Sequence, residues 1–171
     1  LDKELQVFFM AVGMPMFQGY GLSEATPVIS SNGPRRYQFG SSGVMVKPFE
    51  MKICDPDGNE LPEGEKGEMV CKGENVMMGY YKNEEATVAA FTEDGWLRTG
   101  DLGYMDKKQN IFIRGRIKSM FLGASGQNIY PEEIEDKLNN QAGVAESIVV
   151  EREGKLIGLV FPDEEATKGF S

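Results

Sequence analysis

The 171-residue sequence contains no histidine. This absence excludes Ser-His-Asp and Cys-His nucleophile systems, histidine metal ligands and an imidazole general base. The only cysteines, Cys54 and Cys71, lack the spacing of a metal site and are too few for a disulfide framework. We interpret both as small buried hydrophobic residues of a protein in a reducing compartment.

Long apolar runs and a surplus of basic residues are also missing. No run approaches the roughly 20 apolar residues of a membrane-spanning helix. The 27 acidic and 18 basic side chains give a net charge of −9, which argues against binding to a nucleic-acid backbone. Because the sequence starts at Leu1 without a signal or transit peptide, we expect a piece of a longer cytoplasmic protein, with peripheral contact to a membrane left open.

Glycine, by contrast, is abundant: 21 of the 171 residues are glycine, against an average usage of about 7%. The glycines follow no fixed period and separate short apolar runs, as tight turns between strands require. Apolar residues alternate with their neighbours at 51–53 and again at 69–71, which predicts strands. Residues 44–73 should therefore form antiparallel hairpins, with a turn at 55–58.

Helix signals are clearest at two positions. Asn83 is a good N-cap, and the two acidic residues after it suit the first turn of a helix that ends near Phe91. Pro131 stands at a favoured first helical position and predicts a second helix. The other expected elements are a helix over 1–12, a loop over 30–43, and strands over 102–105, 111–113, 147–151 and 156–161.

Together these elements predict an α+β protein made of two bodies. Residues 1–116 should form a β-rich unit, a small distorted barrel or sandwich of hairpins. Residues 117–171 should form a small α/β unit that is cut short. We expect a hinge near Lys118, because few apolar residues between Arg114 and Lys118 would tie the two bodies together.

A first candidate motif, at 20–24, combines groups suited to a nucleotide. Tyr20 offers a flat face on which a purine can stack, and Gly21 allows a close approach of the backbone. Ser23 can donate to a phosphate oxygen, and Glu24 is a hard oxygen ligand suited to Mg²⁺. Taken alone, the same residues also suit a simple turn with a surface acid and a tyrosine at the edge of the core.

Two further motifs are each ambiguous alone. Asp101 follows a glycine turn at the expected start of a strand, where one carboxylate can accept from two ribose hydroxyls, or can simply form an Asx-type turn. The basic run at 114–118 offers guanidinium groups for phosphate oxygens, or a solvated surface. Met77 and Met78 are interpreted as filler of the core.

In order and spacing, the segments 20–24, 96–101, 115–118 and 126–135 resemble the AMP-forming (adenylate-forming) acyl-CoA synthetases. The resemblance covers essentially the whole chain, and the loop at 126–131 is most similar to the long-chain fatty acid branch. It implies that the first body is the end of the large nucleotide-binding domain. The second body would be the start of the small, mobile carboxy-terminal domain.

The resemblance implies a role for each matching residue. Tyr20 would stack on adenine, while Gln18 and Gly19 would line the pocket of the acyl-adenylate. Ser23 would meet the α-phosphate. Glu24 would bind Mg²⁺ and so take part in catalysis.

The later motifs receive implied roles in the same way. Asp101 would hold both ribose hydroxyls, and Arg116 would reach the ribose and phosphate as a second catalytic residue. Lys118 would occupy the hinge about which the small domain swings. Ser125 and Gly126 would lie near the pantetheine arm of coenzyme A. Tyr130 stands where the family commonly has a serine N-cap, which predicts a poorly capped helix.

The implied activity is that of an ATP-dependent fatty acyl-CoA ligase. Such an enzyme converts a fatty acid, ATP and coenzyme A into acyl-CoA, AMP and diphosphate through an acyl-adenylate, with Mg²⁺. The family's phosphate loop and acyl pocket would precede Leu1, and its adenylation lysine would follow Ser171, so we expect this chain to be inactive alone. Two alternatives stay open: an adenylation domain of a peptide synthetase or luciferase-like enzyme, and a non-catalytic β-rich interaction module.

Overall fold

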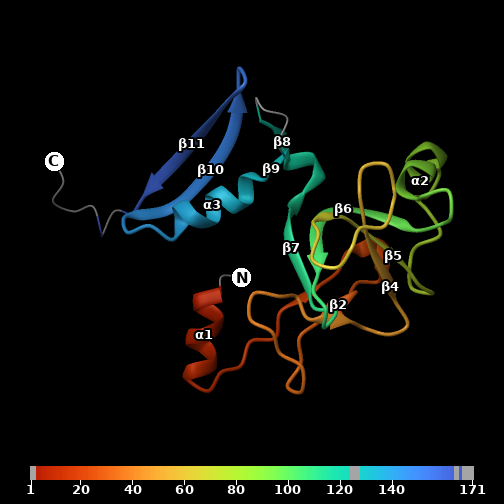
Figure 1. Ribbon diagram of the computed structural model, residues 1–171, viewed down its shortest axis with the longest axis horizontal. Coiled ribbons are helices and arrows are strands. Elements are labelled where there is room, and N and C mark those ends of the chain that lie inside the picture. Colours follow the sequence, from red (N-terminus) through yellow and green to blue (C-terminus); the bar gives the residue numbers. More distant parts are fainter. Residues whose placement is uncertain (1–2, 124–127, 164–165, 167–171) are drawn as a thin grey trace. The chain divides into compact units, whose positions relative to one another are not determined.

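The computed structural model describes residues 3–123, 128–163 and 166. Its backbone divides into two compact units, Leu1–Ile113 and Arg114–Ser171. Strands outnumber helices in the described part of each unit (Figure 1), so the predicted α+β class is confirmed. The sheets are open rather than closed into a barrel among the described residues.

The first unit carries most of the secondary structure. β4 to β7 form a four-stranded sheet in that order, and β1 to β3 form a separate three-stranded sheet. β7 continues from the first unit into the second. The elements, in chain order, are α1 (Lys3–Ala11), β1 (Gly19–Tyr20), the 3-10 turn η1 (Ser23–Ala25), β2 (Ser30–Ser31), β3 (Val44–Met45), β4 (Glu50–Cys54), β5 (Gly67–Lys72), α2 (Glu84–Ala90), β6 (Leu97–Met105) and β7 (Ile111–Arg116).

The core of this unit follows from the alternation in β4 and β5. Met51 pairs with Cys71 and Ile53 pairs with Met69 across the antiparallel ladder, so all four side chains lie on one face. That face is buried, as the alternation predicts. The other buried members of the cluster are Ala25, Ile29, Phe49, Leu97 and Ile111.

The opposite face of β5 is buried as well. Val70 packs there in a second cluster with Cys54 and Trp96, so β5 is covered on both sides. Both cysteines are free and buried, as predicted. Burial raises the pKa of the Cys71 thiol to about 11, which keeps it protonated and unreactive near neutral pH.

Local capping chemistry forms α2 and the 55–58 turn as predicted. The Asn83 side chain accepts a hydrogen bond from the backbone N–H of Ala86 at 3.0 Å, which satisfies one of the unpaired donors at the start of α2. In the turn, the Asp55 carboxylate accepts from the backbone N–H of Asn59 at 2.8 Å.

Three local expectations are wrong. β6 begins at Leu97 rather than near residue 102, because a register irregularity in its pairing with β5 lets the strand continue through the earlier turn residues. The expected loop over 30–43 contains β2, and buried Asn32 ties it together by donating to the Ser41 carbonyl at 2.7 Å. Met78 is fully exposed and does not fill the core.

The second unit is smaller. α3 lies along β10 (Figure 1), and β10 pairs with β11 as an antiparallel hairpin. As predicted, Tyr130 gives the start of α3 no side-chain cap. None of the described helices is long and apolar enough to cross a bilayer. The elements are η2 (Ile117–Ser119), β8 (Phe121–Leu122), β9 (Asn128–Ile129), α3 (Pro131–Asn139), β10 (Val144–Arg152) and β11 (Lys155–Pro162).

The β10–β11 hairpin is covered on one face. Val149 is buried against α3, and its backbone N–H donates to the Glu135 carboxylate at 2.7 Å. Ile148 and Leu159 are paired on the other face and are 51% and 57% exposed. The described part of this unit therefore buries much less apolar surface than the first unit.

The core of the first unit can be tested with Leu97→Ala. Leu97 is 1% exposed, and removing a buried leucine side chain typically costs about 2–5 kcal/mol. We expect the free energy of unfolding to fall by that amount in urea titrations that follow the fluorescence of Trp96, the single tryptophan. Val88→Ala is the control, because Val88 is 70% exposed. This variant should change the free energy of unfolding by no more than about 0.5 kcal/mol. Equal losses in both variants would contradict this core.

The difference in burial between the units has its own test. Segments with few buried apolar contacts open at lower free energy than core strands. Amide hydrogens of β10 and β11 should therefore exchange before those of β4 and β5 in a hydrogen-exchange experiment. Uniform protection across all four strands would show a single cooperative unit instead.

Candidate functional site

The segment that follows β1 is anchored by its own backbone and by one apolar residue. η1 contains Ser23, Glu24 and the fully buried Ala25. The backbone carbonyl of Glu24 accepts from the N–H of Met77 at 2.7 Å. Ser23 is exposed on this turn, and Glu24 is half-buried. The fold thus presents a hydroxyl and a carboxylate side by side at the surface of the first unit.

Tyr20 and Asp101 meet although they are 81 positions apart. The Tyr20 hydroxyl donates to Oδ2 of Asp101 at 2.7 Å. Asp101 is 7% exposed and lies within β6. Its backbone N–H donates to Oγ1 of Thr99 at 3.1 Å, and that hydroxyl donates to the Met69 carbonyl at 2.7 Å. The backbone of Asp101 is therefore fixed within the sheet, and its carboxylate is held by the Tyr20 phenol.

The environment of Tyr20 determines its protonation. Burial is the main cause that raises the pKa of this phenol far above its usual value, and the neighbouring Asp101 carboxylate raises it further. A hydrogen bond with Thr99 lowers the pKa and offsets part of this rise. The phenol consequently stays protonated at any physiological pH and acts as a neutral donor to Asp101.

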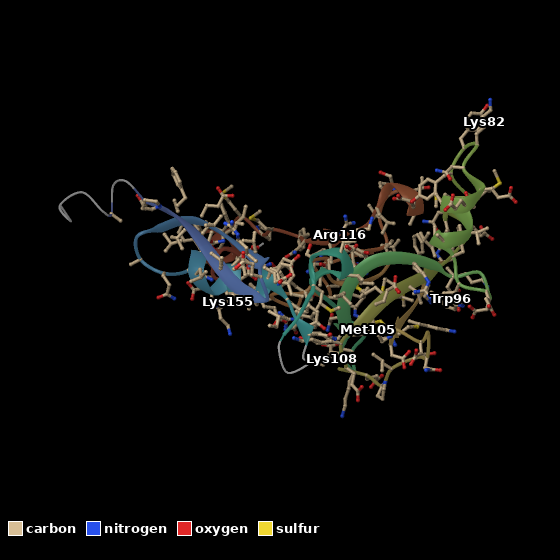
Figure 2. All side chains as sticks on the ribbon, turned by 90° about the horizontal axis from the view of Figure 1, so that it is seen from above. Lys82, Trp96, Met105, Lys108, Arg116 and Lys155 are labelled. Carbon is tan, nitrogen blue, oxygen red and sulfur yellow. The ribbon has the colours of Figure 1, made fainter. Side chains whose placement is uncertain are left out.

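A second phenol contacts the carboxylate of Glu24. The Tyr80 hydroxyl donates to Oε1 of Glu24 at 2.9 Å across 56 positions of sequence. This hydrogen bond is the main cause that raises the pKa of Tyr80. Tyr80 belongs to the segment between β5 and α2, and Figure 2 shows Lys82 at the outer tip of that segment.

The glycines of this region serve the packing of the chain itself. A Cβ atom on Gly21 would lie 1.6 Å from the carbonyl oxygen of Pro27, so no other residue fits while the two backbone segments keep this approach. Gly19 pairs with Ser31 in the β1–β2 ladder. The Gln18 side chain accepts from Nε2 of Gln6 at 2.6 Å, which links the residue before β1 to α1.

The remaining candidate residues lie elsewhere. Arg116 ends β7 and Lys118 lies in η2, both exposed and both in the second unit. Ser125 and Gly126 lie outside the described residues. Two of the candidate residues of the first unit, Tyr20 and Asp101, are therefore in direct contact.

Sequence reasoning missed the side chains that hold the candidate carboxylates. Thr99 lies in the segment 96–101 named above and Tyr80 lies outside the four named segments, and neither was given a role. Gln6, which was not singled out either, is fully buried, donates to the Gln18 side chain and accepts from the backbone N–H of Gly40. No local pattern signals such contacts, because each partner is distant in sequence.

A magnesium ion would suit the chemistry of Glu24. Among the described residues there is no group of three or more cysteine and carboxylate side chains that could enclose a metal. Mg²⁺ is usually held by one or two carboxylates together with waters and substrate phosphates. A single partly exposed carboxylate beside a hydroxyl fits that kind of site and does not fit an all-protein cage.

The sequence of the chain is similar to a known enzyme family and to two kinds of coenzyme A ligase. Residues 1–81 match the model of a family described as AMP-binding enzyme. The chain is 43% identical over 140 residues to a long-chain-fatty-acid–CoA ligase of Salmonella typhimurium, covering 81% of the chain and 24% of that protein. It is 40% identical over 158 residues to 4-coumarate–CoA ligase 5 of Oryza sativa subsp. japonica, covering 88% of the chain and 29% of that protein.

A solved structure extends the likeness to the fold. O-succinylbenzoate coenzyme A synthetase (MenE) from Bacillus subtilis, in complex with ATP and magnesium ion, matches with a TM-score of 0.83 and 34% identity, covering 94% of this chain and 34% of that chain. The chain thus spans about a quarter to a third of the length of these proteins. In both sequence and fold, it belongs to the AMP-binding enzyme family.

Proposed function

We propose that the protein containing this chain is an AMP-forming acid–thiol ligase. It would join a carboxylic acid to ATP as an acyl-adenylate with release of diphosphate, and coenzyme A would then displace AMP. The observation that carries the proposal is the buried Asp101 carboxylate held by the Tyr20 phenol in the β1 segment. The MenE relative, solved with ATP and magnesium ion, supports the choice of nucleotide.

The first unit would hold the nucleotide. Asp101 accepts from the Tyr20 phenol through Oδ2, and its carboxylate would also accept from the ribose hydroxyls. A carboxylate that accepts from vicinal hydroxyls is a common way of binding ribose. The ring of Tyr20 would contact adenine, and Gln18 and Gly19 would line the neighbouring acyl-adenylate pocket.

The η1 turn would face the phosphates. Ser23 would donate to an α-phosphate oxygen, and Glu24 would bind Mg²⁺. When bound, Mg²⁺ supplies positive charge that neutralises the phosphate oxygens. Because catalysis by positioning and charge neutralisation requires no imidazole, the absence of histidine does not conflict with this chemistry.

We assign a long-chain fatty acid as the carboxylate. The support is the 43% identity over 140 residues with a long-chain-fatty-acid–CoA ligase. We place the protein in the cytoplasm, because its two buried cysteines are free, as in a reducing compartment.

The second unit would complete the reaction cycle. Arg116 would reach the ribose and phosphate, and Lys118 would be the hinge between the adenylation and thioester-forming arrangements. Ser125 and Gly126 would lie near the pantetheine arm of coenzyme A. The support is the exposure of Arg116 and Lys118 close to the boundary between the two compact units.

The ribose assignment predicts the behaviour of Asp101→Asn. Replacing the carboxylate removes charge-assisted hydrogen bonds, which are typically worth about 1.5–3 kcal/mol. Binding of AMP to the 171-residue chain, followed by NMR titration, should weaken by that amount. The wild type should bind AMP more tightly than 2′-deoxy-AMP, and the variant should show no such preference.

Asp57→Asn is the matched control, because it removes the same charge from an exposed turn of the same unit. It should leave both affinities unchanged. If Asp101→Asn keeps the wild-type preference for AMP, the carboxylate does not bind the ribose.

The chain by itself should not catalyse the reaction. It spans about a quarter of the length of its ligase relatives, so most of the groups that such an enzyme uses lie outside it. Incubation with ATP, Mg²⁺, and either a long-chain fatty acid or 4-coumarate should release no more diphosphate than a heat-treated sample does. Release clearly above that background would show that the described units suffice for adenylation.

A further inference from the structure

Three hydrogen bonds attach the η1 turn and its C-cap residue, Thr26, to a segment distant in sequence. The Glu24 carbonyl accepts from Met77 N–H at 2.7 Å. The Thr26 hydroxyl donates to the Asn75 carbonyl at 2.9 Å, and the Asn75 side-chain amide donates to the Ala25 carbonyl at 3.4 Å. These three hydrogen bonds, with the burial of Ala25, hold the turn in place without help from any phenol.

Tyr80 adds a contact of a different kind. Its hydroxyl donates to Oε1 of Glu24 at 2.9 Å, and so it holds the carboxylate rather than the backbone. Tyr80 is 41% exposed and contributes little to the core. Because the turn is already fixed, this contact is not needed for the fold.

The backbone of Tyr80 is itself fixed by α2. Its N–H donates to Oγ1 of Thr87 at 2.9 Å, and the Thr87 hydroxyl donates to the Asn83 carbonyl at 2.8 Å. Gly79 has a φ of +150°, and a Cβ there would lie 2.5 Å from Cγ2 of Thr87. A side chain at position 79 would therefore push Tyr80 away from Thr87 and Glu24.

We propose that Tyr80 is a positioning residue that orients the Glu24 carboxylate toward a divalent cation. Its phenol holds Oε1, and among the described residues Oε2 has no hydrogen bond, so that oxygen is left to the cation. The proposal rests on the assignment of Glu24 as the magnesium ligand. A carboxylate held in one orientation loses less conformational freedom when it binds a metal.

The test uses the 171-residue chain labelled with ¹⁵N, with ATP and Mn²⁺ as a paramagnetic substitute for Mg²⁺. In the wild type, Mn²⁺ should broaden the amide signals of 23–26 and 77–80, and Glu24→Gln should abolish this broadening. Tyr80→Phe should need about tenfold more Mn²⁺ for the same broadening, because loss of a partner that orients a metal ligand typically costs 10–100-fold in affinity.

Tyr81→Phe is the matched control, because Tyr81 is the adjacent tyrosine and is 88% exposed. It should respond to Mn²⁺ like the wild type. Tyr80→Phe should keep the wild-type affinity for ATP in EDTA and the wild-type thermal midpoint, neither of which depends on the orientation of a metal ligand.

The outcomes separate the two proposals. If Glu24→Gln abolishes the broadening while Tyr80→Phe matches the wild type, Glu24 is the ligand and the positioning role of Tyr80 is wrong. If the wild type shows no broadening near Glu24, the magnesium assignment fails, and the role of Tyr80 fails with it. A parallel loss of metal-free ATP binding in Tyr80→Phe would mean that the phenol supports the structure of the site instead.

Discussion

The hydrogen bond between Tyr20 and Asp101 ties the β1 segment to β6 within the first unit. A carboxylate as buried as Asp101 is costly unless its oxygens are satisfied. The Tyr20 phenol supplies one partner, so the β1 segment must lie against β6, 81 positions later. β5 lies next to β6 in the sheet, with the core on one of its faces and the Trp96 cluster on the other.

A hydrogen bond from a tyrosine hydroxyl to a carboxylate occurs twice in this unit. The Tyr20 hydroxyl donates to Asp101, the carboxylate expected from the sequence to bind ribose. The Tyr80 hydroxyl donates to Glu24, the carboxylate expected to bind Mg²⁺. Asp101 is almost fully buried whereas Glu24 is half-buried. The first carboxylate is thereby suited to a neutral, hydroxyl-bearing group, and the second to a hydrated cation.

Features that depend on neighbours in sequence were predictable. The cap at Asn83 and the paired alternation of β4 and β5 follow from local chemistry and from a period of two residues, and both are as expected. The start of β6 was misplaced, because a register irregularity in another strand decides it. The contact of Tyr80 with Glu24 could not be predicted, since no local pattern links them. Gly21 was singled out because it lets the backbone approach a purine closely, whereas the close neighbour that the structure shows is the Pro27 carbonyl.

One face of the β10–β11 hairpin, left exposed by the described residues of its own unit, affects how the chain behaves at high concentration. Ile148, Leu159 and Phe161 are more than half exposed there, and a two-stranded ribbon has free edges that another copy can extend. The net charge of −9 opposes such self-association through mutual repulsion between copies. Added salt shortens the range of this repulsion to about 10 Å at 0.1 M. We therefore expect self-association to increase with ionic strength, and single copies of the chain to persist best in dilute, low-salt buffers.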